Sequence, residues 1–119
     1  MIALMVLSLM AGSTTPEQHL MGTGNDVLAI CSSTETDDQM GCFMWIKGVI
    51  GATYVAMADV KTCVFELPSG VTGLQEMDVI RAYLKSHAEV RHLPGAVLAM
   101  RALKEAFPCP KAQAVPVKP

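Results

Sequence analysis

The sequence has no excess of basic residues and few charged residues of either sign. Its 119 residues include nine lysines and arginines against eleven acidic residues, which gives a net charge of −2, and only 17 % are charged. Proteins that bind nucleic acids usually carry a basic patch or stripe. Nucleic-acid binding therefore has no support, and the length allows one domain with a single hydrophobic core.

The motifs of common catalytic and metal sites are also missing. The chain contains no C-x-x-C pair, no H-E-x-x-H and no G-x-S-x-G, which mark redox or zinc sites, zinc proteases and serine hydrolases. His87 and His92 are five residues apart, which is the wrong spacing for a metal pair on one helical face. We therefore expect a protein that is not an enzyme and holds neither a metal nor a cofactor.

The two ends of the chain differ in composition from its middle. Residues 1–13 are apolar and end in small residues, which is typical of a secretory signal peptide. This stretch lacks the usual basic start, so an amphipathic or partly buried N-terminal helix is the alternative interpretation. Residues 111–119 offer little to bury and are predicted to be a disordered tail. The expected domain spans residues 14–110.

A long apolar helix is predicted from residue 36 to about residue 60. Thr36 and Gln39 fit a capping box at its start. The residues that follow are apolar on nearly every face, which indicates a buried central helix or a membrane span. Lys47 near the middle disfavours the membrane span, because a lysine there costs about 2.5–3.5 kcal/mol. Three glycines also suit close helix contacts in a soluble core: Gly41, Gly48 and Gly51.

Three shorter helices are predicted around it, at residues 24–33, 73–85 and 93–107, with a tight turn or a single helical turn at 86–89. Thr72 and Gln75 form a second capping box, and Pro94 pre-sets the first turn of the last helix. Apolar residues at helical spacing are expected to face the core: Val27, Leu28, Cys31, Leu74, Met77, Ile80, Tyr83, Leu84, Val97, Met100, Leu103 and Phe107. The predicted fold is a small, all-α, four-helix domain with short helical turns, stapled by disulfides.

The four cysteines are expected to form two disulfides, as in small exported proteins. Cys42 and Cys63 lie at opposite ends of the long helix and therefore about 30 Å apart, too far for a bridge. If successive helices alternate in direction, the pairs Cys31–Cys42 and Cys63–Cys109 are brought together. The alternative is four reduced core thiols in a cytosolic protein.

Several stretches of the sequence carry a family resemblance. They are GVTGLQ at 70–75, VIRAYLKSH at 79–87, RHLPGA at 91–96 and ALKEAFPCP at 102–110, preceded by GNDVL at 24–28, Cys31 and Cys42. Together they resemble the Rap/Tai family of type VI secretion amidase immunity proteins, over residues 24–110. Two positions depart from the family's pattern. Ala88 stands where a proline is frequent, and in residues 47–51 an apolar residue follows the glycine where a polar one is usual.

This resemblance implies a small, exported, periplasmic helical protein, with no stable membrane insertion, that forms a homodimer. It would bind a peptidoglycan amidase effector, block its active site and protect the producing cell. Partner-binding residues are expected in two exposed links, at Glu35, Asp37 and Asp38 and at Glu66 and Ser69. The alternative is a stand-alone periplasmic structural or chaperone-like protein with no amidase partner.

Overall fold

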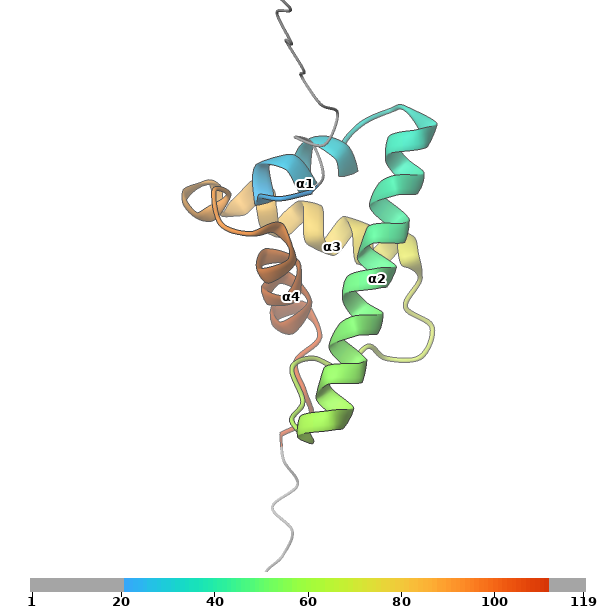
Figure 1. Cartoon of the computed structure of the whole chain (residues 1–119), viewed down its shortest axis with the longest axis vertical. Helices are drawn as coiled ribbons and strands as arrows, with labels where there is room; N and C mark the ends of the chain where they lie inside the picture. The colour runs from blue at the N-terminus through green and yellow to red at the C-terminus, as the bar shows by residue number, and fades with distance from the viewer. Residues whose placement is uncertain (1–20, 112–119) are drawn as a thin grey trace, which may run out of the picture.

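The computed structural model describes residues 21–111, which form four α-helices and one short 3₁₀ helix (Figure 1). The helices are α1 (Gly24–Cys31), α2 (Thr36–Val60), α3 (Gly73–Ser86) and α4 (Gly95–Ala106), with the 3₁₀ helix η2 (Ala88–Val90) before α4. No strand occurs between residues 21 and 111. The predicted all-α, four-helix fold is confirmed. The predicted signal peptide (1–13) and tail residues 112–119 lie outside the described residues.

The start of α1 is fixed by its own cap and by the start of α4. Thr23 and Asp26 form a capping box, in which the Asp26 backbone N–H donates to the threonine hydroxyl and the carboxylate accepts from the Thr23 N–H. The Gly95 N–H donates to the Gly22 carbonyl at 3.0 Å. A side chain at position 95 would come within 2.6 Å of the Val27 side chain, so this close approach requires glycine.

The start of α2 differs from the predicted capping box at Thr36. The N-cap residue is Glu35, and no side chain caps this helix. Instead of reaching back to the cap, the Gln39 side chain donates to the Ser33 carbonyl at 3.2 Å. The Ser33 hydroxyl accepts from the Glu35 backbone N–H, so the preceding turn bonds the N-cap N–H in place of the Gln39 side chain.

Only one face of α2 is buried, which corrects the prediction of a helix buried on every side. Cys42, Ile46, Ile50 and Thr53 point into the core, at the spacing of a single helical face. Within residues 21–111, α2 is the one helix long and apolar enough to cross a membrane by length and composition alone, and 28 % of its most apolar stretch is buried. The three glycines that were expected to make close contacts have open space around them.

The shorter helices α3 and α4 pack on α2 and on each other, and α3 crosses α2 near its middle (Figure 1). The capping box of Thr72 and Gln75 is confirmed. Leu74 was expected in the core, but it lies in the first turn of α3, at an open groove between α2 and α3, and is 68 % exposed. Helix α4 begins at Gly95, two residues later than predicted, because Pro94 is the extended N-cap residue.

The core is built from all four helices and the connection between α2 and α3. Its fully buried residues include Val27, Cys31, Cys42, Ile46, Phe65, Ile80, Leu84, Leu98 and Leu103. Val97 and Met100, which were expected to face the core, are only half-buried, because Leu98, Ala99 and Ala102 take the inward positions of α4. Phe65 was not predicted and occupies the centre of the α2–α3 connection.

Two disulfides join the ends of the helices, and both match the predicted pairs. Cys31 at the end of α1 bonds to Cys42 in the second turn of α2, with their Cα atoms 5.2 Å apart. Cys63, just past α2, bonds to Cys109, just past α4, with a Cα–Cα distance of 6.1 Å. The described residues include no free cysteine. The long helix is therefore covalently tied near both ends.

Candidate partner-binding site

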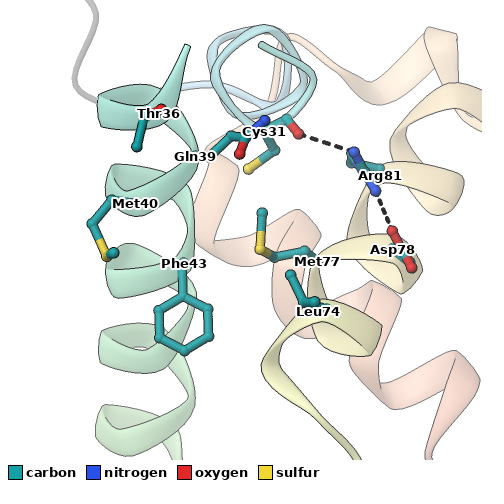
Figure 2. A pocket seen from close by; sticks show the side chains of 9 residues that line it. All are labelled: Cys31, Thr36, Gln39, Met40, Phe43, Leu74, Met77, Asp78 and Arg81. Carbon is teal, nitrogen blue, oxygen red and sulfur yellow. Dashed lines mark hydrogen bonds and ion pairs between the residues drawn. The ribbon is translucent and has the colours of Figure 1, made fainter. Parts of the chain in front are cut away.

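A groove lies between the first half of α2 and the start of α3, and we call it the α2–α3 groove. Its volume is about 400 Å³, and Figure 2 shows the side chains that line it. Side chains of both helices line it, together with the buried end of α1: Cys31, Thr36, Gln39, Met40, Phe43, Leu74, Met77, Asp78 and Arg81. Met40 and Leu74 are largely exposed, so the groove presents apolar surface to solvent.

One rim of this groove is charged and rigidly held. Arg81 forms an ion pair with Asp78 on the same helix. Its guanidinium also donates to the Cys31 backbone carbonyl at 3.3 Å, which ties α3 to the end of α1 (Figure 2). An apolar groove with a polar rim is the arrangement found in protein–protein interfaces, where aromatic and methionine side chains are enriched at the centre.

The far end of the groove is held by an ion pair and a close ring contact. Lys47 Nζ lies 3.0 and 3.1 Å from the two carboxylate oxygens of Glu76, and Glu76 is only 2 % exposed. A side chain at Gly73 would collide with the Phe43 ring, so glycine allows α3 to start directly against α2. The same ammonium group lies 5.7 Å from the centre of the Phe43 ring. These contacts fix the distance between the two helices.

The structure separates the two predicted groups of partner-binding residues. Glu35, Asp37 and Asp38 lie at the first turn of α2, where acids are favoured by the helix dipole, and Thr36 between them lines the α2–α3 groove. Glu66 lies beside Cys63 past the other end of this helix, which is about 37 Å long. Ser69 precedes Gly70, whose φ of 92° makes the turn toward α3. The two groups do not form one site.

Sequence reasoning missed the apolar residues of the groove, Met40, Phe43 and Leu74. For Met40, the sequence does contain a signal that it lies outside the core. Once Cys42 and Ile46 define the inward face of α2, helical periodicity turns Met40 away from it. No such signal exists for Leu74, because its exposure depends on where α3 starts relative to α2.

The described part of the chain shows no gathered set of ligating residues. No group of three or more His, Cys, Asp or Glu side chains between residues 21 and 111 could hold a metal ion. His87 ends α3, where its Nδ1 atom lies 2.7 Å from the Tyr83 carbonyl and its ring stacks on the Tyr83 ring at 4.0 Å. These two contacts hold the His87 ring against the last turn of α3.

The fold defines a class: small helical proteins whose helices are joined by disulfides. Within that class the family is clear. The family model of the Rap1a immunity proteins matches residues 23–109, well over half of the chain, and the chain belongs to this family. Comparison with curated proteins finds no match, and comparison with solved structures finds none.

Proposed function

We propose that this chain is a periplasmic immunity protein that binds and inhibits a peptidoglycan amidase effector of type VI secretion, and that it acts as a homodimer. The observation that carries this proposal is the match to the Rap1a immunity proteins over residues 23–109. Immunity proteins of this kind act by binding rather than by catalysis. The two disulfides support export, because such bonds persist in oxidising compartments.

We place the effector contact at the α2–α3 groove and the acidic residues beside it. Exposed Met40 and Leu74 supply apolar contact area there, and Glu35 and Asp37 add negative charge at the same end of α2. Apolar anchors give affinity, and surrounding charges give selectivity and association rate. The disulfide at the floor of the groove keeps its shape fixed, so little ordering entropy opposes binding.

The test is an inhibition assay with a peptidoglycan amidase that is found encoded beside this chain's gene. The purified, oxidised chain is titrated against the amidase while cleavage of isolated peptidoglycan is followed. Stoichiometric inhibition is expected. If the chain neither binds nor inhibits that amidase, the proposed function is wrong and the stand-alone structural or chaperone-like alternative gains.

Variants locate the contact within the same assay. Leu74→Asp and Asp37→Lys should weaken inhibition by about tenfold or more, which corresponds to about 1.4 kcal/mol. Glu66→Lys, a matched charge reversal at the second predicted site, should leave inhibition unchanged if the groove is the contact. If Glu66→Lys weakens inhibition while Leu74→Asp and Asp37→Lys do not, the effector contact lies at the connection that contains Glu66 and Ser69.

A further inference from the structure

The methionines of the chain differ widely in exposure. The sequence holds nine of them. On α2, Met40 and Met44 are 58 % and 59 % exposed, whereas Met77 on α3 is 6 % exposed. The other methionines between residues 21 and 111 are half-buried: Met21, Met57 and Met100. Methionine usually fills irregular gaps in a core, so two largely exposed thioethers one helical turn apart are open to chemistry from which the rest are shielded.

We propose that Met40 is a site of oxidation to methionine sulfoxide, and that this modification weakens binding at the α2–α3 groove, which Met40 lines. The effect on binding rests on the proposed function, which places the effector contact there. The oxidant is a peroxide or a hypohalous acid. The thioether sulfur attacks the electrophilic oxygen atom and forms the S–O bond, so the sulfur is oxidised by two electrons. With hydrogen peroxide the O–O bond breaks, and the second oxygen leaves as hydroxide, which takes the proton from the first and becomes water.

Burial and hydrogen bonding protect other methionines from such an oxidant. Met77 lines the same groove, but it reaches between α2 and α3 and is almost fully buried (Figure 2). Met57 is half-buried, and its sulfur accepts a hydrogen bond from the Val64 backbone N–H at 2.9 Å. That bond occupies a lone pair that the sulfur needs to attack an oxidant. An oxidant in solution therefore meets the sulfur atoms of Met40 and Met44 first.

The added oxygen changes the polarity of the groove. A thioether is apolar, whereas a sulfoxide is polar and its oxygen accepts hydrogen bonds. The apolar part of the groove includes Met40, Phe43 and Leu74. The side-chain N–H groups of Gln39 and Arg81 already donate to backbone carbonyls of the chain. A partner that covers Met40 would therefore bury a polar oxygen among apolar side chains, which is unfavourable, and we expect a loss of affinity of about tenfold.

Met44 provides a matched comparison on the same helix. It is as exposed as Met40 and follows it by four residues. Helical periodicity turns Met44 about 40° further from Phe43 than Met40 is, and Met44 lies outside the α2–α3 groove. Oxidation of Met44 therefore adds the same polar group to α2 away from the proposed contact. Comparing these two equally accessible sulfur atoms isolates the effect of a sulfoxide in the groove.

Peptide mass mapping tests which methionine is modified. The full chain, with its disulfides formed, is treated with rising doses of hydrogen peroxide, and sulfoxides are assigned after digestion. Met40 and Met44 should be modified at similar rates, and Met77 at least about tenfold more slowly, because the oxidant must reach the sulfur atom. Circular dichroism checks that the chain remains folded at the doses that are compared.

The amidase inhibition assay tests the consequence for binding. Peroxide is removed with catalase before the amidase is added, so that only the immunity chain is oxidised. Treatment of the wild-type chain should raise its inhibition constant about tenfold. Met40→Leu should inhibit as well as wild type before treatment, since leucine and methionine have similar volumes, and it should keep that inhibition afterwards. Met44→Leu is the matched control and should lose inhibition on treatment as wild type does.

Three outcomes would overturn the proposal. One is a mass map in which Met77 is oxidised as fast as Met40. Another is a chain that carries sulfoxide at every Met40 and inhibits as well as the untreated chain. The third is a Met40→Leu chain that loses as much inhibition on treatment as wild type, which would assign the loss to another residue. A chain that fails to inhibit before treatment refutes the proposed function and the effect on inhibition, while the mass map still decides whether Met40 is a site of oxidation.

Discussion

The ion pair between α2 and α3 gives the sharpest prediction about stability. The Glu76 side chain is 3 % exposed, whereas that of Lys47 is 42 % exposed. The two partners therefore respond differently to losing one another. Without its lysine, the carboxylate remains buried with no opposite charge. Without its glutamate, the ammonium group can turn into water.

This difference in burial determines how much unfolding free energy is lost when either partner is removed. Removing one partner of a fully buried pair costs about 3–5 kcal/mol, and a surface pair contributes about 1 kcal/mol at most. With one partner buried and the other half in water, we expect Lys47→Met to lower the free energy of unfolding by about 2 kcal/mol. Glu76→Leu should lower it by about 1 kcal/mol or less, because the leucine fills the same apolar site.

Urea unfolding of the oxidised chain measures these values, with circular dichroism and the fluorescence of Trp45 as probes. The double variant Lys47→Met, Glu76→Leu should be more stable than Lys47→Met alone, because it leaves no unpaired buried charge. Lys104→Met on the exposed side of α4 is the control and should stay within about 0.5 kcal/mol of wild type. The reasoning is refuted if Lys47→Met also stays within that range, or if Glu76→Leu is the more damaging change.

Three other changes test the packing, the long disulfide and the helix caps by the same unfolding assay. Gly95→Ala should cost about 2 kcal/mol, because the new methyl group would meet a valine side chain and two backbone carbonyls; a stabilised variant would contradict the close approach. Replacing Cys63 and Cys109 by serine should cost about 4 kcal/mol, since the bond closes a loop of 46 residues; a loss below 1 kcal/mol would contradict this. Thr72→Ala should cost about 1 kcal/mol, whereas Thr36→Ala should change little because Thr36 is not a cap; equal losses would restore the predicted capping box.

The parts of the fold that the sequence predicted correctly depend on local rules and on covalent distance limits. The cap at Thr72 places the start of α3. A continuous α2 excludes a bond between Cys42 and Cys63. The pair Cys63–Cys109 was then selected by assuming that successive helices alternate in direction, and the structure has this pair.

The errors all concern what lies beside a residue in space. Thr36 and Gln39 have the composition of a capping box, but Ser33 in the preceding turn offers competing hydrogen bonds. Leu74 fits the apolar stripe of α3, yet it lies in the first turn, beyond the core and beside Phe43. The candidate groove could not be predicted for the same reason, because its shape depends on how α2 and α3 pack against each other.

The apolar composition of α2 is compatible with a membrane span, a buried core helix and a helix at a protein interface, and Lys47 disfavours the first of these. The pattern of burial separates these interpretations. Ile46 and Ile50 bind the helix to the core on one face, while Lys47 beside them pairs with a buried glutamate of α3. The opposite face is exposed, and within residues 21–111 no atom lies within 4 Å of a side-chain carbon built on its glycines Gly41, Gly48 and Gly51. Exposed apolar patches of this kind often mark sites of interaction with another protein or a membrane.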